Sequence, residues 1–161
     1  MHNLIQLPFD LPGQIYRSPM PFGLFDEGGT TIDEYDQAGI NLVVMLIDEE
    51  EDLFRTGKKL DRIYRSHGME VLRYPIEDFD TPDDIKGLSA ALETVEAAAR
   101  AGKNIAVHCY AGRGRTGMFL ALLGRRVLGL GGEEAITWVR RFFPAIETVD
   151  QEDLVRGEPF A

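Results

Sequence analysis

The sequence predicts a single α/β domain over residues 1–161, with a mostly parallel central sheet of four to five strands flanked by helices. Three observations predict this fold class. A chain of 161 residues has the size of one domain. Residues 42–46, Leu-Val-Val-Met-Leu, form a continuous apolar run, which is expected of a strand buried on both faces. Strand and helix patterns alternate along the chain, which is typical of parallel sheets.

The first half of the chain predicts three strands and two helices, in the order strand Ile15–Ser18, helix Thr31–Ala38, strand 42–46, helix Glu51–His67 and strand Glu70–Tyr74. Gly39 follows the first helix directly and is expected to end it. The second helix is polar but carries Leu53, Leu60 and Ile63 at helical spacing.

The second half predicts one strand and four helices, in the order helix Pro82–Ala101, strand Asn104–His108, helix Thr116–Leu128, helix Glu133–Phe143 and helix Val149–Arg156. The helix from Pro82 has the clearest signals, with Thr81 as a possible cap, Pro82 at its first position and Gly102 after its end. Its apolar stripe consists of Ile85, Leu88, Leu92, Val95 and Ala99.

The charge of the chain is negative and unevenly distributed. Lys and Arg number 17 against 27 Asp and Glu, a net charge of −10, which disfavours nucleic acid as a partner. Between Asp26 and Asp61 there are eleven acids and three bases, whereas between Arg100 and Arg141 there are eight bases and two acids. If the protein binds an anion, the site is expected in the second stretch; taken alone, both stretches are more simply interpreted as solvated surfaces.

The cellular setting is predicted from what the sequence lacks. One cysteine allows no disulfide within the chain, which fits a reducing cytoplasm. The first residues do not resemble a signal peptide, and no apolar run has the length of a membrane span. We expect a cytoplasmic protein without a membrane anchor; a monomer is favoured, although the sequence does not determine the oligomeric state.

The loop after the strand Asn104–His108 carries the strongest chemical signal. It reads His-Cys-Tyr-Ala-Gly-Arg-Gly-Arg-Thr-Gly and leads into a helix N-terminus, where backbone N–H groups and the helix dipole attract anions. Its glycines let successive N–H groups converge on one phosphate. The predicted phosphate-binding residues are Cys109, Tyr110, Ala111, Gly112, Arg113, Gly114 and Arg115, the last through its guanidinium group.

Cys109 lies in the same positive field, which favours the thiolate form of a cysteine and makes it a strong nucleophile. Together with the anion-binding loop and Arg115, it predicts attack on a phosphate ester. A lone cysteine after a buried strand is often only an inert core residue. That interpretation would leave the accompanying pattern of His108, Gly112 and Arg115 to chance.

Other motifs were weighed against this prediction. Residues 112–117 also satisfy G-x-G-x-x-G, but no later strand carries the acid that a dinucleotide-binding fold requires. There is no Walker A motif, and one cysteine with three scattered histidines forms no metal-ligand pattern. We therefore expect neither a cofactor nor a metal.

The pattern His108-Cys109-x-x-Gly112-x-x-Arg115-Thr116-Gly117 resembles the signature of the protein tyrosine phosphatase superfamily. The short chain resembles its dual-specificity branch. Three further segments resemble this family: residues 16–21 resemble the start of such domains, residues 74–82 the mobile general-acid loop, and residues 145–151 the segment that positions water. The resemblance implies a phosphatase domain with the corresponding fold.

The resemblance also implies roles for single residues. Asp78, which precedes Cys109 by 31 positions, corresponds to the general acid, with Asp80 and Asp83 as rivals; Asp83 is more simply interpreted as a helix cap. By the same resemblance, Thr116 eases departure of the thiolate and Gln151 orients the attacking water. His108 is expected to shape the loop through hydrogen bonds and not to act as a base.

The sequence thus predicts a phosphatase that hydrolyses phosphate monoesters through a phosphocysteine, with phosphotyrosine in proteins as the main expected substrate; the substrate is a phosphorylated protein or a small phosphate monoester. The absence of an obvious phosphotyrosine-recognition segment favours a shallow pocket that also admits phosphoserine and phosphothreonine. Inositol phosphates or phosphoinositides are a secondary alternative: similar phosphoinositide phosphatases often carry two lysines within the loop, whereas this chain has one arginine, Arg113, which is equally interpreted as a solvated loop base. A phosphate-binding module without catalysis is another alternative. Sulfur transfer of the rhodanese type is disfavoured by residues 115–117 and by the Asp78 loop.

Overall fold

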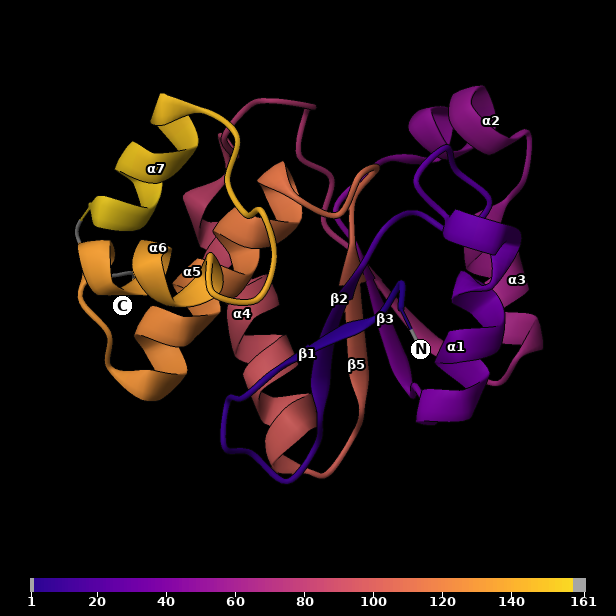
Figure 1. Cartoon of the computed structure of the whole chain (residues 1–161), viewed down its shortest axis with the longest axis horizontal. Helices are drawn as coiled ribbons and strands as arrows, with labels where there is room; N and C mark the ends of the chain where they lie inside the picture. The colour runs from indigo at the N-terminus through magenta and orange to yellow at the C-terminus, as the bar shows by residue number, and fades with distance from the viewer. Residues whose placement is uncertain (1, 158–161) are drawn as a thin grey trace.

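The central sheet has the strand order β1-β2-β5-β3-β4 in a computed structural model that describes residues 2–157 (Figure 1). β1 (Ile5–Leu7) pairs antiparallel with β2 (Ile15–Ser18). β5 (Ile105–His108) lies parallel between β2 and β3 (Leu42–Met45), and β4 (Glu70–Arg73) pairs parallel with β3. This arrangement confirms the predicted α/β class and the mostly parallel sheet. Residues 1 and 158–161 of the predicted domain lie outside the described part.

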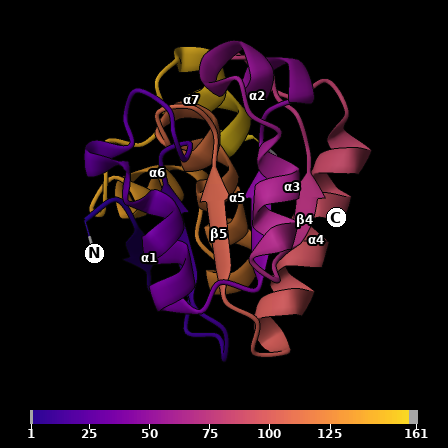
Figure 2. The same cartoon turned by 90° about the vertical axis from the view of Figure 1, so that its right-hand side faces the viewer.

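The helices of the described residues are α1 (Thr31–Ala38), α2 (Glu49–Thr56), α3 (Leu60–Ser66), α4 (Ile85–Arg100), α5 (Gly114–Leu128), α6 (Gly132–Val139) and α7 (Val149–Arg156), with a short 3₁₀ helix at Glu27–Gly29. Figures 1 and 2 show α1 and α3 on one face of the sheet and α4, α5 and α6 on the other. Within residues 2–157, no helix combines the length and the apolar character needed to cross a membrane.

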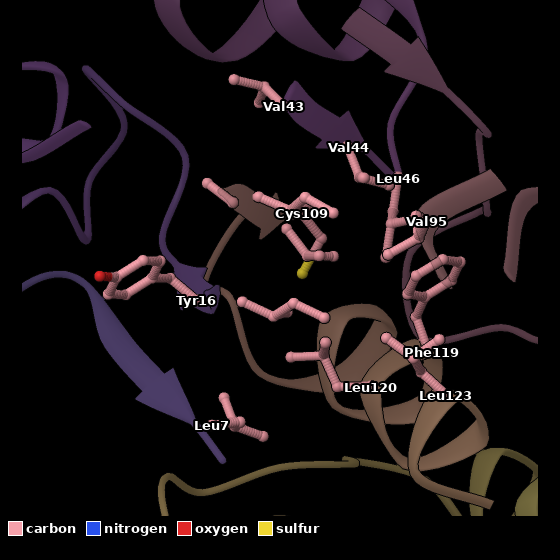
Figure 3. Packing of buried hydrophobic residues seen from close by; sticks show 14 of the residues in the cluster. Leu7, Tyr16, Val43, Val44, Leu46, Val95, Cys109, Phe119, Leu120 and Leu123 are labelled. Carbon is pink, nitrogen blue, oxygen red and sulfur yellow. The ribbon is translucent and has the colours of Figure 1, made fainter. Parts of the chain in front are cut away.

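The core lies where the sheet meets α4 and α5. All residues of β2, β3 and β5 are buried, and so is α5 from Gly114 to Gly124. Figure 3 shows Val44, Val95 and Phe119 in the buried apolar cluster between these elements. Removal of so much apolar surface from water is the main stabilising contribution to a domain of this kind.

The register of the parallel strands determines where the loops meet. Ser18 of β2 and Met45 of β3 both lie beside His108, the last residue of β5. The three strands therefore end level with one another. The loop that contains Cys109 is brought beside the segment that leads from β3 into α2, at the edge where ligands bind in such sheets.

Residues 51–67 do not form the single helix that was predicted. They divide into α2 and α3, because Gly57 adopts a left-handed conformation with φ of 69° and its N–H closes the end of α2 on the Leu53 carbonyl. Leu60 begins the next helix and is fully buried, whereas Leu53 remains 42% exposed. The helical spacing of the apolar residues therefore continued across the boundary between two separate helices.

Two other elements also differ from the predictions. Ile15–Ser18 is the second strand and not the first, because β1 precedes it. The predicted helix Glu133–Phe143 is α6, which ends at Val139, and Phe143 is buried beyond it. α1 and α7 have the predicted bounds.

The start of α4 is also corrected. The helix begins at Ile85 and not at Pro82, and its cap is Asp84, whose side chain accepts a hydrogen bond of 2.9 Å from the Gly87 N–H. Neither Thr81 nor Asp83 is the cap. Ile85, predicted in the apolar stripe, is 41% exposed, whereas the other four members of that stripe are buried.

Candidate active site

The loop between β5 and α5 is held by hydrogen bonds to its carbonyl groups. The Tyr110 carbonyl accepts from the Met20 N–H (2.9 Å), and the Arg113 carbonyl accepts from the Ile146 N–H (3.1 Å). The carbonyls of Ala111 and Gly112 both accept from Arg17, as described below. No N–H of residues 110–113 donates to another group in the described part of the chain. These N–H groups are therefore available to an anion, as the sequence predicted.

Arg17 of β2 fixes the turn of the loop. Its Nη2 donates to Ala111 O (2.9 Å) and Gly112 O (3.0 Å), and its Nε also donates to Gly112 O (3.1 Å). Gly112 has φ of 74°, and a Cβ there would collide with the Ser18 carbonyl and the Arg17 guanidinium, so only glycine fits. Burial lowers the pKa of Arg17 to about 10, partly offset by the nearby Cys109. The guanidinium remains charged at neutral pH.

Cys109 and Arg115 line one pocket of about 290 Å³, together with Asp78 and the rings of Phe25, Phe79 and Tyr110. Cys109 is only 3% exposed, so its side chain contacts the core as well as this pocket. It is a free cysteine. Within residues 2–157, no cluster of His, Cys, Asp and Glu is arranged to hold a metal.

Arg115 points its guanidinium into this pocket while carboxylates hold it from behind. Its Nη1 and Nη2 donate to the two oxygens of Glu51 (2.8 and 3.0 Å), and Nη1 also donates to Ile76 O (3.0 Å). Burial acts to lower the pKa of Arg115, but the hydrogen bonds to Glu51 and the charges of the groups around the guanidinium outweigh burial and raise that pKa. Nε is buried and has no partner among the described residues. An unpaired buried donor is costly, so this N–H indicates a ligand position.

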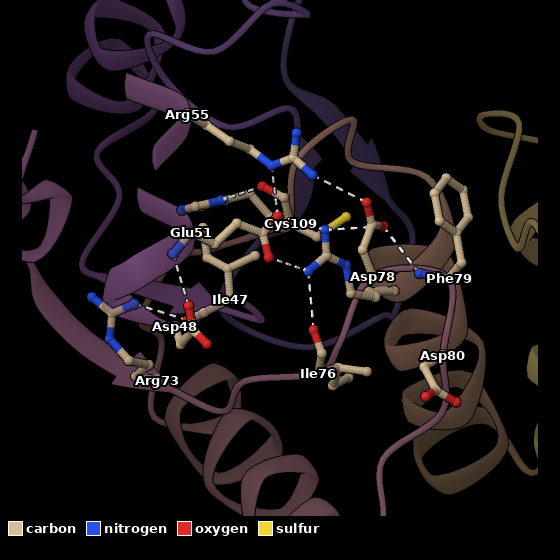
Figure 4. A network of polar contacts seen from close by, with 12 residues as sticks. Ile47, Asp48, Glu51, Arg55, Arg73, Ile76, Asp78, Phe79, Asp80 and Cys109 are labelled. Atoms are coloured by element: carbon tan, nitrogen blue, oxygen red, sulfur yellow. Dashed lines mark hydrogen bonds and ion pairs between the residues drawn. The ribbon is translucent and has the colours of Figure 1, made fainter. Parts of the chain in front are cut away.

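Asp78 is the predicted acid that the structure brings to Cys109. Its Oδ1 lies 3.2 Å from Arg115 Nη2 and its Oδ2 lies 3.2 Å from Arg55 Nη2. Figure 4 shows Asp78 directed toward Cys109 and Asp80 directed away from it. Asp80 and Asp83 are exposed, and neither lines the pocket. Of the three candidate acids, only Asp78 is therefore near the sulfur.

His108 has the hydrogen bonds of a residue that shapes the loop. It is fully buried; its Nδ1 donates to the Cys109 carbonyl (2.9 Å), which leaves Nε2 to accept from the Tyr64 hydroxyl (2.7 Å). Burial lowers the pKa of His108 to about 4. A neutral imidazole at neutral pH is thus consistent with a structural role.

Thr116 and Gln151 have different surroundings. The Thr116 hydroxyl is buried and, within the described chain, has no hydrogen-bond partner. Gln151 is also buried, but its Oε1 accepts from the N–H of Glu147 (2.9 Å) and its Nε2 donates to the Asp80 carbonyl (3.2 Å). Gln151 therefore connects the start of α7 to the loop that carries Asp78. Its predicted role toward water stays a prediction.

Three residues of the site were not assigned to it from the sequence. Glu51 holds Arg115, and Arg17 holds the phosphate-binding loop. Arg55 donates through Nε to Glu51 (2.9 Å) and stacks 3.6 Å from the centre of the Tyr110 ring. A charged residue inside the buried strand Ile15–Ser18 was a usable signal for Arg17. Glu51 and Arg55 lie in the acidic stretch, from which no anion site was expected.

Nothing after β5 supports a dinucleotide-binding fold. α5, α6 and α7 follow one another without another strand up to residue 157. The glycines of G-x-G-x-x-G serve other purposes here: Gly112 makes the turn of the loop, and Gly117 packs so closely on Ala145 that a Cβ would collide with it. The described residues therefore do not support the dinucleotide-binding interpretation of this loop.

Comparison with known proteins gives one family match. The family described as "Polymorphic toxin system, DSP-PTPase phosphatase" matches residues 27–125, which include Glu51, Asp78, Cys109 and Arg115. The chain is also 30% identical over 108 residues to an uncharacterized protein of Methanocaldococcus jannaschii, MJECL20, an alignment that covers 60% of this chain and 70% of that protein.

Several solved structures share the fold. Kinase associated phosphatase with its catalytic cysteine replaced by serine gives a TM-score of 0.82 at 22% identity, covering 94% of this chain and 90% of that one. Tk-PTP in its active form gives 0.75 at 30% identity, covering 94% and 93%. PTPMT1 in complex with PI(5)P gives 0.72 at 19% identity, covering 88% and 87%.

Proposed function

The chain belongs to the DSP-PTPase phosphatase family, and on that premise we propose that it hydrolyses phosphate monoesters through a phosphocysteine on Cys109. We propose phosphotyrosine in proteins as its main substrate, with phosphoserine and phosphothreonine also accepted. The observation that carries the proposal is the buried Nε–H of Arg115, which has no partner among residues 2–157, on a residue that lines the same pocket as Cys109.

The first step is transfer of the phosphoryl group to sulfur. The Cys109 thiolate attacks phosphorus, an S–P bond forms, and the bond from phosphorus to the leaving oxygen breaks. Asp78 gives its proton to that oxygen. The N–H groups of residues 110–113 and the Arg115 guanidinium bind the equatorial phosphate oxygens, where charge is spread in the transition state.

The second step is hydrolysis of the phosphocysteine. Water attacks phosphorus, Asp78 takes a proton from that water, and the S–P bond breaks to release inorganic phosphate and the thiolate. The Thr116 hydroxyl, which has no other partner in the described chain, is available to hydrogen-bond the departing sulfur. We keep Gln151 as a candidate for orienting water through the N–H of its amide that does not bind Asp80.

The walls of the pocket support an aromatic substrate. Phe25, Phe79 and Tyr110 surround the opening above Cys109, and the Phe25 and Tyr110 rings contact each other edge to face at 5.3 Å. Aromatic rings favour such contacts with another ring. A phenyl phosphate ester would be able to contact these walls while its phosphate reaches the loop. An alkyl ester would make fewer contacts, so we expect lower but measurable activity on phosphoserine and phosphothreonine.

One observation favours a second candidate substrate, a soluble inositol phosphate or a phosphoinositide. Arg113 is exposed at the edge of the pocket and contacts the Phe25 ring at 5.4 Å, and it forms no ion pair with any described carboxylate. A second phosphate on the substrate would find a cation there. We rank this candidate after phosphotyrosine because the aromatic walls support an aromatic ester.

A substrate panel tests the proposal. We would measure phosphate release from matched phosphotyrosine, phosphoserine and phosphothreonine peptides and from inositol phosphates, with wild type and Cys109→Ser. The expected order is phosphotyrosine first, with all release lost in Cys109→Ser. If inositol phosphates were the best substrates, they would replace phosphotyrosine as the proposed main substrate. Phosphate binding without turnover in wild type would indicate a phosphate-binding module, and cyanide-dependent thiocyanate formation from thiosulfate would indicate sulfur transfer.

A further inference from the structure

We propose that Arg55 is the positioning residue of the general acid: it holds Asp78 over Cys109 once a phosphate has taken the place of Asp78 on Arg115. The inference rests on the proposed function, because it assigns a task within that reaction. It concerns a residue of α2, outside the phosphate-binding loop and outside the loop of Asp78.

Arg55 connects three segments that are distant in the sequence. Its Nη2 lies 3.2 Å from Asp78 Oδ2, its Nε donates to Glu51 Oε2 (2.9 Å), and its guanidinium carbon lies over the Tyr110 ring, 3.6 Å from the ring centre. The side chain is 21% exposed. Three contacts of different kinds on one planar group leave it little freedom, which is the property expected of a residue that orients another.

Asp78 is bound by two arginines, but only one of them remains available to it during catalysis. Arg115 contacts Asp78 through Nη2. A phosphate above Cys109 would take donors from the same guanidinium, whose Nη1 is already bound to Glu51 and Ile76. Competition for Arg115 would release Asp78 Oδ1, the oxygen that must then exchange a proton with the leaving group. Among the described residues, Arg55 is then the only cation paired with Asp78.

Glu51 couples the two arginines. Its Oε2 accepts from both Arg115 Nη2 (3.0 Å) and Arg55 Nε (2.9 Å), so one carboxylate orients the group that binds phosphate and the group that holds the acid (Figure 4). Arg55 is in addition supported by the Tyr110 ring, which belongs to the phosphate-binding loop itself. The distance from acid to sulfur is therefore controlled from the same framework that controls the phosphate.

The consequence is a dependence on the leaving group. Proton donation matters most for a leaving oxygen that is strongly basic and least for one that departs easily as an anion. Loss of Arg55 should therefore slow an ester with a poor leaving group and spare an ester with a good one. A residue that only supported the fold would slow both to the same extent.

The first experiment measures position without activity. Amide hydrogen exchange of residues 77–83 would be compared in the full chain, in the presence of saturating inorganic phosphate, for wild type, Arg55→Gln and the control Arg62→Gln, which changes an exposed arginine of α3. We expect faster exchange in Arg55→Gln alone. Unchanged exchange in Arg55→Gln would overturn the positioning role, whether or not the protein proves to be a phosphatase.

The second experiment measures kcat/KM on phenyl phosphate and on para-nitrophenyl phosphate. Arg55→Gln should lose roughly tenfold more activity on the first substrate than on the second, Arg55→Lys should recover part of the loss, and Arg55→Gln should add no selectivity in an Asp78→Asn background. Equal losses on both substrates, or the same selectivity without Asp78, would contradict the inference. Wild type that turns over neither ester would refute the proposed function instead, and the exchange experiment would still decide the position of Asp78.

Discussion

Replacement of Arg17 by methionine separates the stability of the fold from the shape of the phosphate-binding loop. Arg17→Met keeps much of the apolar stem but removes the donors to the carbonyls of Asn3, Ala111 and Gly112. A buried carbonyl left without a donor costs about 2 kcal/mol, which amounts to about 6 kcal/mol for three. The lowered pKa of Arg17, about 10 against 12.5, corresponds to about 3 kcal/mol of burial cost that the variant no longer carries. We therefore expect the free energy of unfolding to fall by about 3 kcal/mol.

The assay is urea denaturation with and without inorganic phosphate. A ligand that binds only the folded state at 100 times its Kd adds about 2.7 kcal/mol to the free energy of unfolding. We expect wild type to show this increment and Arg17→Met to lose most of it, because two of the carbonyls that turn the loop are no longer held. The loss of stability alone would not distinguish this account from a general defect.

Arg125→Met is the matched control. Arg125 also donates to backbone carbonyls, those of Leu130 (3.3 Å) and Val155 (2.6 Å), but it lies outside the pocket. Arg125→Met should have a lower free energy of unfolding than wild type, but inorganic phosphate should still raise that free energy by the wild-type amount. If Arg17→Met retained the full increment, or if Arg125→Met lost it equally, the role assigned to Arg17 would be refuted.

The remaining predictions concern single residues of the site. Asp78→Ala should lower kcat by about 10²–10⁴ and Asp80→Ala should leave it near the wild-type value; steady-state kinetics showing the reverse would reassign the acid. His108 has a folded-state pKa of about 4 against 6.5, so it binds fewer protons folded than unfolded, and its contribution to stability is complete above pH 6.5 and declines toward pH 4. Urea unfolding at pH 7 and pH 4 should show a loss of about 3 kcal/mol in wild type relative to His108→Gln; parallel pH profiles would contradict this. Gly112→Ala should abolish phosphate binding, because φ of 74° and two collisions exclude a Cβ; calorimetric binding at wild-type affinity would disprove the fit.

The placement of the predicted catalytic loop could be inferred from the sequence because its residues are adjacent along the chain. His108, Cys109, Gly112 and Arg115 lie within eight positions, and a strand followed by a helix N-terminus determines their relative placement. Glu51 and Arg55 are different, since they reach the pocket only because β3 pairs with β5. No local pattern reports which strands are neighbours, and these two residues therefore resembled an ordinary solvated helix face.

The errors in the elements have local physical causes. The break at Gly57 was hidden because Leu53 and Leu60 keep helical spacing across it, although only Leu60 is buried. Pro82 suited the first position of a helix, but the helix begins later because Asp84 caps it. The Asp84 carboxylate accepts a hydrogen bond from the Gly87 N–H, and the absence of a Cβ at Gly87 leaves room for that carboxylate. β1 has three residues, too few for a pattern of alternation.

The sequence around Gln151 has two interpretations: the family resemblance implies a role toward water, and the local spacing predicts a helix cap. Thr148 and Gln151 have the spacing of a capping box, and the structure contains one: the Thr148 hydroxyl accepts from the Gln151 N–H (3.1 Å), and Gln151 Oε1 accepts from the Thr148 N–H (3.3 Å). The amide oxygen is thus used within α7. A role toward water would depend on its nitrogen alone.

The most direct test of the central claim is to look for the phosphoryl group on sulfur. Wild type and Cys109→Ser would be mixed with para-nitrophenyl phosphate, quenched in acid during turnover and digested, and the peptide that contains residue 109 would be weighed by mass spectrometry. We predict one added phosphoryl group on Cys109 in wild type, and neither modification nor turnover in Cys109→Ser. Continued phosphate release by Cys109→Ser, or a phosphoryl group on any other residue during turnover, would contradict the account.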